Sequence, residues 1–315
     1  MSADTRTVGS GATASAVESA HYEQDELWEH QDVLGDSTYR PRLDAAAAFV
    51  PDPSASILEV GAGDGRGLHH LIAAGHDPRR LIALDRSGTA LRRSGLTAVQ
   101  GSADELPVAS RGLDGVICAE VLEHLPAPVY DRARAELERV ADDWLIVSVP
   151  NRERRHRADI TCSDCGCRYN ADRHLRSFAP EDLPGLFERF QVEAVVEVGP
   201  HQPVYPRRAR LAMERRGLLV RPGSPSCPQC GKRYEFSAGA AHDDQPPAGE
   251  QPPADRRAGA SSNDGHTRRS PGTGVASTAP SRTSALRSGV YRAGRRFLPQ
   301  AKHPYHLVAF FRRVG

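Results

Sequence analysis

Glycine occupies every second position from 61 to 67, directly after the apolar run Ile57–Val60. A strand that enters such a turn and continues into a helix, here 68–74, brings backbone amides close to a bound ligand, because glycine has no Cβ to clash. The dinucleotide pattern G-x-G-x-x-G does not fit, since Arg66 stands where its third glycine would be. The feature predicts an α/β fold that binds its ligand at the end of the first strand.

Strands and helices alternate after this turn. We expect strands at 57–60, 81–85, 96–100, 113–119 and 144–149, and helices at 68–74, 88–94 and 127–140. This alternation predicts a Rossmann-like, doubly wound, mostly parallel sheet with helices on both faces. A helix at 180–190 and a strand at 192–198 follow. The apolar segment His306–Phe311 predicts an antiparallel last strand, which would pair with 192–198 as a hairpin with a very long loop.

The flanking segments differ in composition from this core. Residues 237–284 consist mostly of Pro, Gly, Ala, Ser, Asp and Arg, which cannot bury enough apolar surface to fold. We expect a disordered N-terminus (1–20), a helical cap (21–50), the core (51–200, with a first cysteine motif at 160–170), an insertion with a second cysteine motif (201–236), a disordered linker (237–284), and a basic stretch with the last strand (285–315).

Residues 59–65 read E-x-G-x-G-x-G, which resembles motif I of the class I S-adenosylmethionine (SAM) dependent methyltransferases. The segments 113–125, 147–151 and 174–178 are similar to the type 11 group, which is typified by enzymes of ubiquinone and menaquinone biosynthesis. The resemblance covers about residues 50–200 and 305–312, but neither cysteine motif nor the linker. It implies SAM as the cofactor and methyl transfer as the reaction.

The resemblance also implies which residues hold SAM. Glu59 and Asp64 would meet its ammonium group, Asp85 would accept hydrogen bonds from the ribose hydroxyls, and Asp104 would accept from the adenine amine. The expected cofactor-binding set is Glu59, Gly61, Gly63, Asp64, Gly65, Asp85, Arg86, Ala103, Asp104 and Glu105. The alternative is another Rossmann-like protein with a chance glycine-rich turn, which leaves the acidic residues at three strand ends unexplained.

Two segments, 162–169 and 227–234, both read C-x-x-C-G-x-R-Y. Repeated hooks of this kind are zinc knuckles, and two of them supply the four thiolates of a closed structural zinc site. The expected ligands are Cys162, Cys165, Cys227 and Cys230. Cys167 aligns with Lys232 and is not expected to be a ligand, and Cys118 is expected to be a buried small residue on a strand. A redox pair or disulfides are the alternatives to zinc.

The hooks follow two strands that end at the carboxyl edge of the predicted sheet, where ligands bind. The zinc module would therefore stand beside the entrance for the methyl acceptor. The alternative is a clip that only stabilises the fold.

Methyl transfer from a sulfonium is an in-line displacement, which requires alignment and removal of a proton from the acceptor. Glu120, His124 and His174 are the candidates for this proton transfer; otherwise they cap a helix or line the cofactor pocket. The basic run 152–157 would bind an anionic substrate or form a solvated face.

The chain has 41 basic and 40 acidic residues, a balance that gives no general attraction to nucleic acid or membranes. Apolar runs are shorter than the roughly 20 residues of a membrane span. We expect a cytoplasmic SAM-dependent methyltransferase with reduced or metal-bound cysteines, acting on a small molecule or glycan, with O-methylation favoured. The alternatives are an RNA methyltransferase and a non-catalytic, zinc-dependent binding module.

Overall fold

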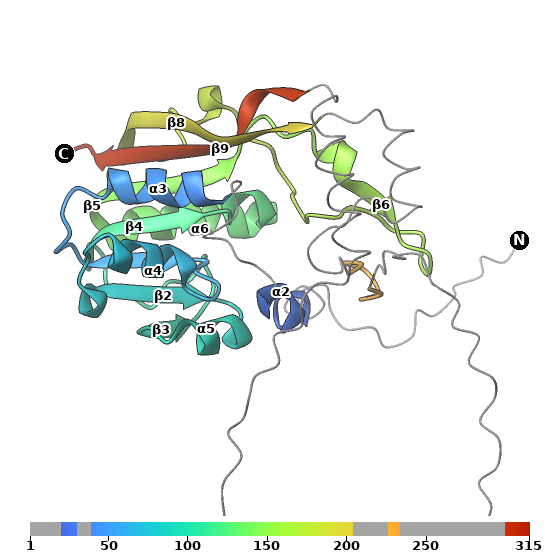
Figure 1. Ribbon diagram of the computed structural model, residues 1–315, viewed down its shortest axis with the longest axis horizontal. Coiled ribbons are helices and arrows are strands. Elements are labelled where there is room, and N and C mark those ends of the chain that lie inside the picture. The colour runs from blue at the N-terminus through green and yellow to red at the C-terminus, as the bar shows by residue number, and fades with distance from the viewer. Residues whose placement is uncertain (1–19, 30–38, 204–225, 234–299) are drawn as a thin grey trace, which may run out of the picture.

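The computed structural model describes residues 20–29, 39–203, 226–233 and 300–315. Within them, one sheet has seven strands in the order β3-β2-β1-β4-β5-β9-β8 (Figure 1). The strands are β1 (Ile57–Val60), β2 (Leu81–Asp85), β3 (Ala98–Gln100), β4 (Leu113–Ala119), β5 (Ala141–Pro150), β8 (Phe190–Pro203) and β9 (Gln300–Arg313). The first five pair in parallel, and β9 is antiparallel to both of its neighbours. The predicted fold class is confirmed.

The helices connect these strands. They are α2 (Glu26–Glu29), α3 (Arg40–Phe49), α4 (Arg66–Ala73), α5 (Gly88–Ser94) and α6 (Ala127–Val140), with the 3₁₀ turns η1 (Pro78–Arg80), η2 (Leu122–His124), η3 (Arg155–Ala158) and η4 (Pro180–Asp182). Local chemistry sets their ends. The hydroxyl of Ser87 accepts from the amide of Ala90 and caps α5, which ends at Gly95 with a φ of 63°.

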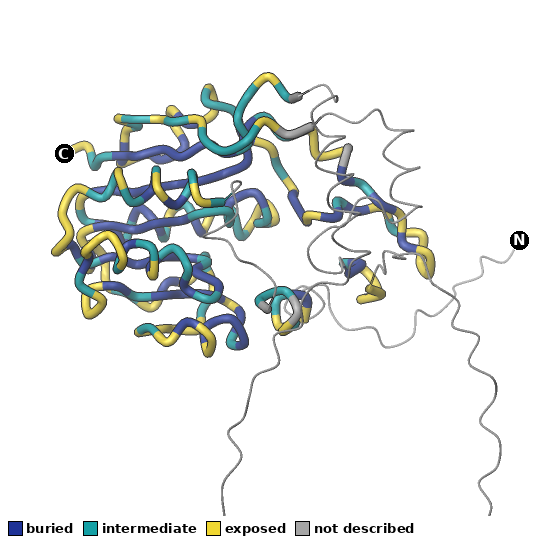
Figure 2. Tube along the Cα trace, viewed as in Figure 1, coloured by how far each residue is buried: buried dark blue, intermediate teal, exposed yellow. Residues whose placement is uncertain are grey.

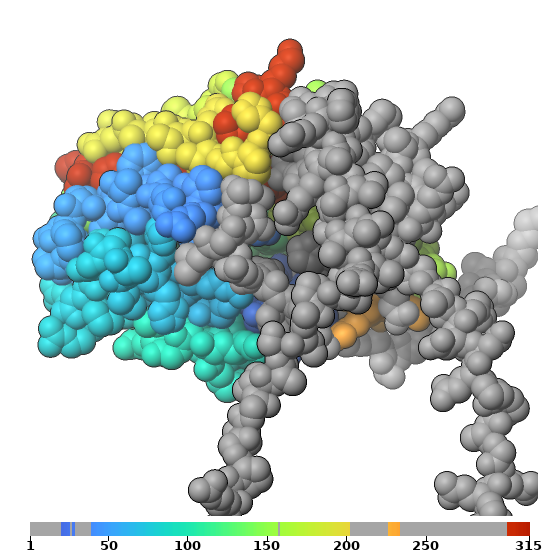
Figure 3. Space-filling view, in the orientation of Figure 1, coloured from blue at the N-terminus to red at the C-terminus, as the bar shows by residue number. Residues whose placement is uncertain are grey.

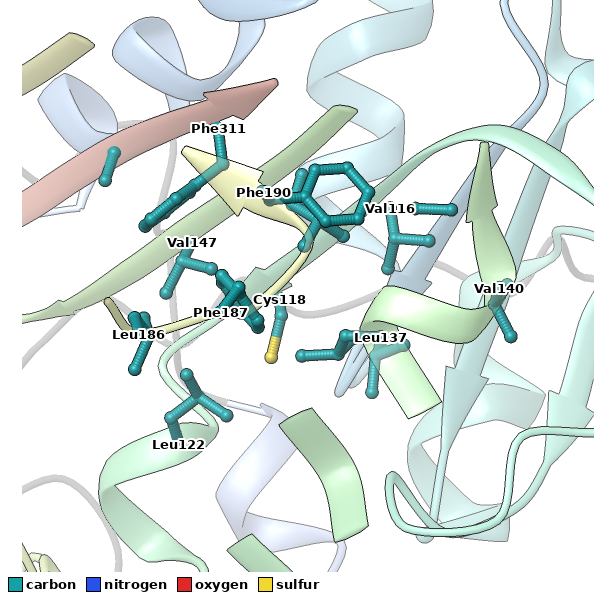
Figure 4. Packing of buried hydrophobic residues seen from close by; sticks show 14 of the residues in the cluster. Val116, Cys118, Leu122, Leu137, Val140, Val147, Leu186, Phe187, Phe190 and Phe311 are labelled. Atoms are coloured by element: carbon teal, nitrogen blue, oxygen red, sulfur yellow. The ribbon is translucent and has the colours of Figure 1, made fainter. Parts of the chain in front are cut away.

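Apolar side chains cover both faces of the sheet, and the central strands are buried (Figure 2). On one face α3 and α4 contribute Ala46, Leu68 and Leu71 to a cluster with Trp144 and Phe310. In Figure 3, α3 lies beside β8 on this side. The other face is covered by α6 and the segment before β8; its cluster includes Val116, Cys118, Leu122, Leu137, Val140, Val147, Leu186, Phe187, Phe190 and Phe311 (Figure 4).

Three expected elements differ in the structure. The helix predicted at 180–190 is wrong: η4 ends at Asp182, because Pro184 has no amide to donate and Gly185 has a φ of 81°. The strand expected from residue 96 begins at Ala98. The cap expected to be helical throughout 21–50 has a turn at residues 23–25 between helical segments.

The predicted hairpin between the strands at 192–198 and 306–311 is confirmed. Val196 pairs with Val308, and the pairing extends to Pro203 opposite Gln300. Of the N-terminus expected to be disordered (1–20), residue 20 is described and is helical. The rest of that segment, the linker expected at 237–284, most of the insertion (204–225 and 234–236) and the basic stretch up to 299 lie outside the described residues.

The cysteine segments lie beyond the carboxyl ends of the parallel strands. A small two-stranded sheet, β6 (Asp159–Thr161) with β7 (Arg168–Asn170), follows β5, and residues 226–233 lie near it, on the same side as α2 (Figure 1). Because β8 runs in the same direction as β5, both hooks follow strands that end at this edge, as predicted. No helix within residues 20–29, 39–203, 226–233 and 300–315 combines the length and hydrophobicity that a bilayer crossing requires.

Candidate cofactor site and cysteine tetrad

The glycine-rich turn is tied to the end of β2. The amides of Gly61 and Ala62 donate to the carbonyl oxygen of Leu84, and the amide of Gly63 donates to the Asp85 carboxylate at 2.8 Å. The other carboxylate oxygen of Asp85 accepts from the amide of Ser87 at 2.8 Å. Burial raises the pKa of Asp85. The structure thus brings together the glycine turn and the acidic residue that the sequence assigned to SAM.

Glu59 lies behind this turn. Its side chain is buried and accepts a hydrogen bond from the amide of Leu68 in the first turn of α4. A carboxylate at this position stabilises the N-terminal end of the helix. A Cβ at Gly67 would lie 2.2 Å from the Glu59 carboxylate, so a larger residue there would displace the Glu59 side chain. Burial raises the pKa of Glu59 to about 7.

The remaining predicted cofactor residues lie along the same edge with partners of their own. Asp64 pairs with Arg66 at 2.7 Å. Asp104 accepts from Arg132 on α6 at 3.0 Å and from Ser102; these contacts hold the pKa of Asp104 below its usual value despite partial burial. Arg86 and Glu105 are exposed, and Ala103 is partly buried.

Residues 20–29 cover the edge of the sheet where the glycine turn lies. The sequence did not predict these contacts. The Glu23 carboxylate accepts from the amides of Gly88 and Thr89 at 2.8 and 2.9 Å, at the start of α5. The indole of Trp28 packs against the glycine turn, so closely that a Cβ at Gly63 would lie 2.8 Å from its ring. The only sequence signal was the cluster of large and acidic side chains in this segment.

The three candidates for proton transfer lie near one another, with Glu120 and His124 after β4 and His174 after β7. Glu120 adopts a φ of 57°, and its carboxylate accepts from Ser148 at 3.0 Å and pairs with His306 at 3.3 Å. Burial would raise the pKa of Glu120, but His306 and Arg42 hold it below its usual value. The rings of His124 and His174 are 4.7 Å apart, edge to face.

The two cysteine hooks have the same backbone geometry. In the first, the amide of Gly166 donates to the Cys162 carbonyl and the amide of Cys162 donates to the Cys167 carbonyl. In the second, Gly231, Cys227 and Lys232 take the same roles. Both glycines have a φ above 70°, a region that glycine tolerates best. The repeated sequence therefore forms a repeated turn.

The four cysteines of the hooks fit a zinc ion. All six cysteines are free, and the four hook sulfurs lie within 4.8 Å of one another. The sulfurs of Cys162 and Cys230, and those of Cys165 and Cys227, are 3.6 Å apart. A tetrahedron with Zn–S bonds of about 2.3 Å has edges of about 3.8 Å, whereas a disulfide requires about 2.05 Å.

The two unassigned cysteines lie as predicted. Cys167 does not belong to this group of four, and Cys118 is buried on β4.

The basic run is only partly available to a ligand. Arg152 pairs with Glu181 at 2.7 Å, and Arg155 donates to the carbonyl oxygen of Leu175 at 2.6 Å. An open hollow of about 430 Å³ is lined by Glu153, Arg154, Arg155, His156, Asp159 and Ser177. Its mixed charge does not favour an anion over other ligands.

Comparisons with known proteins give one family match. A family model described as a methyltransferase domain matches residues 57–143, from the start of β1 into β5. No curated protein matches the chain.

Solved structures of methyltransferases are similar to this chain at low sequence identity. Magnesium protoporphyrin IX methyltransferase from Synechocystis has 15% identity, 59% of this chain and 94% of that chain covered, and a TM-score of 0.46. The 1,6-didemethyltoxoflavin-N1-methyltransferase of Burkholderia thailandensis has 18% identity, coverage of 65% and 88%, and a TM-score of 0.43. A SAM-dependent methyltransferase from Mesorhizobium loti has 16% identity, coverage of 52% and 86%, and a TM-score of 0.40.

Proposed function

We propose that this protein is a SAM-dependent methyltransferase. The observation that carries the proposal is the bond between the Gly63 amide and Asp85, which places a glycine turn and a strand-end carboxylate at the carboxyl edge of a parallel sheet. The match of residues 57–143 to a methyltransferase-domain model supports it. SAM would lie along the turn, with Asp85 at its ribose and the segment around Asp104 at its adenine.

We propose that the acceptor is a small molecule or glycan and that the accepting atom is oxygen. The near-neutral charge of the chain favours this over RNA, which requires a strongly basic surface. The ion pair between Arg152 and Glu181 further reduces the cationic character of the basic run. The acceptor would enter near His124, which follows β4, and His174, which follows β7 of the small sheet.

We further propose that Cys162, Cys165, Cys227 and Cys230 hold one structural Zn²⁺, as their sulfur spacing supports. The zinc would cross-link the insertion after β5 and the insertion after β8. The reaction itself would not pass through it, because a closed site of four thiolates leaves no position for a substrate. A cytoplasmic location stays a prediction.

The activity is tested by incubating the purified protein with methyl-labelled SAM and separate pools of small molecules, glycans and RNA. Label transferred to the first or second pool supports the proposal. Label transferred only to RNA would favour the RNA alternative, and SAM binding without transfer to any pool would favour the non-catalytic binding module.

A further inference from the structure

A buried carboxylate without a hydrogen-bond partner lies next to the two candidate histidines. The side chain of Glu123, in η2 directly after β4, is fully buried. Neither of its carboxylate oxygens has a hydrogen-bond partner among the described residues. An ionised carboxylate loses its hydration on burial and requires a compensating cation or donors. Its ion-pair contact with Nε2 of His124, at 3.9 Å, is longer than a hydrogen bond.

The imidazoles of His124 and His174 lie close to the Glu123 carboxylate. One ligand atom from each of Glu123, His124 and His174 lies within 4.8 Å of the others. The Nδ1 atom of His124 has no hydrogen-bond partner among the described residues. These side chains come from two separate segments, η2 and the loop after β7, so their convergence is a property of the tertiary structure.

The ring of His174 is already oriented. Its Nδ1 atom lies 2.5 Å from the Glu153 carboxylate, which leaves Nε2 for another partner. A carboxylate that holds the far nitrogen of a histidine is the usual outer partner of a metal-binding imidazole.

The surrounding charge favours a cation. Glu120, three residues before Glu123, places a further negative charge near the Glu123 carboxylate. Glu153 adds a further negative charge, and Arg42 compensates in part. A divalent ion bound by Glu123 would offset this excess of negative charge.

We propose that Glu123, His124 and His174 bind a divalent cation, and that its open coordination positions bind a hydroxyl oxygen of the methyl acceptor. Two imidazoles and one carboxylate suit first-row divalent ions and differ from the four soft thiolates of the hooks. Three protein ligands leave positions for an exogenous oxygen. The cation site stands on the side chains alone, whereas its role toward the acceptor rests on the proposed methyltransferase function.

This site would make the acceptor a better nucleophile. A hydroxyl bound to a divalent ion loses its proton more readily. In the transfer, that proton goes to solvent, an oxygen lone pair forms the O–CH₃ bond, and the S–CH₃ bond of SAM breaks with its electron pair left on sulfur. His124 and His174 would then act as ligands and not as the proton acceptors that the sequence suggested.

The test is a titration of the zinc-loaded full chain with Mn²⁺ alone, followed by calorimetry and by the electron paramagnetic resonance of free Mn²⁺. We expect one Mn²⁺ per chain, because thiolates do not select Mn²⁺. Glu123→Gln and His174→Asn should each weaken Mn²⁺ binding at least tenfold, and Glu153→Gln should weaken it by about ten- to a hundredfold as an outer partner. Glu181→Gln, which changes an exposed carboxylate of the same region, should leave binding unchanged.

Melting temperatures measured with and without Mn²⁺ distinguish a variant that no longer binds the ion from one that no longer folds. Mn²⁺ should raise the melting temperature of the wild type and of Glu181→Gln, but not that of Glu123→Gln. If one variant does not fold, the other two ligand-region variants still decide the question. An absence of Mn²⁺ binding in the wild type, or equal affinity in Glu123→Gln and the wild type, would overturn the proposal. Because SAM is left out of the titration, failure here is distinct from failure to bind SAM.

Discussion

Arg173 donates to both the carbonyl oxygen and the hydroxyl of Ser226, each at 2.8 Å. Ser226 precedes Cys227, and Arg173 precedes His174. The guanidinium is buried, and the same Ser226 hydroxyl lies 3.1 Å from Nδ1 of His21. One buried contact therefore connects the second cysteine hook to the candidate acceptor site and to the segment over the cofactor edge.

The first prediction concerns this contact. Arg173→Met should lower the free energy of unfolding by about 1–3 kcal/mol, because the buried carbonyl oxygen of Ser226 loses the hydrogen bond from Arg173. It should also lower kcat, by up to about a hundredfold if His174 moves by about 1 Å, without changing SAM affinity. Calorimetry and steady-state kinetics measure these effects. Arg79→Met, at an exposed arginine, is the matched control and should change neither. Unchanged kcat in Arg173→Met would reduce the contact to a structural one.

The second prediction concerns the metal in the hooks. The purified protein should contain one zinc per chain, and Cys227→Ser should lose it, because three thiolates do not complete a closed site. Zinc binding contributes folding free energy, so the hooks should loosen while the core sheet stays folded and binds SAM. Elemental analysis and calorimetry measure both.

Cys167→Ser is the matched control for the zinc prediction, because Cys167 belongs to the same hook but lies outside the group of four. It should retain zinc. Loss of zinc in both variants, or its absence from the wild type, would refute the ligand assignment. Full activity in zinc-free Cys227→Ser would leave the module as a stabilising clip.

The third prediction concerns the connection between β8 and β9. Pro203 is paired with Gln300, so the ends of the connection are held side by side by the sheet. Deleting residues 245–278 should change the free energy of unfolding by less than about 1 kcal/mol, because loop-closure entropy varies slowly with length. SAM affinity should not change. A fall of several degrees in melting temperature would show that the deleted residues contribute contacts.

The sheet was predictable because its signals are local. Ile57–Val60 and Leu113–Ala119 are short apolar runs bounded by turn residues, and such runs are recognisable as buried strands. The helix expected at 180–190 shows where this reasoning fails. Its apolar residues Leu183, Leu186 and Phe187 are indeed buried, but they pack from an irregular segment that Pro184 and Gly185 interrupt.

The candidate sites were predictable only where their residues are contiguous or repeated. The glycine turn and the two hooks are short motifs with a known chemical use. Glu123 stands beside His124 in the sequence, yet its lack of a hydrogen-bond partner depends on tertiary packing that no local pattern encodes. The role of Glu23 at the start of α5 depends likewise on a contact between distant segments.

A calorimetric titration of the full chain with SAM decides whether the glycine turn and Asp85 form a SAM site. The wild type should bind one SAM per chain, and Asp85→Ala should weaken binding by about 1.5–3 kcal/mol, the cost of losing hydrogen bonds to a charged group. Asp114→Ala removes a carboxylate that holds the amide of Ser56 at the opposite edge of the sheet, and should leave SAM affinity unchanged. Absence of SAM binding in the folded wild type, or equal affinity in Asp85→Ala and the wild type, would contradict the account.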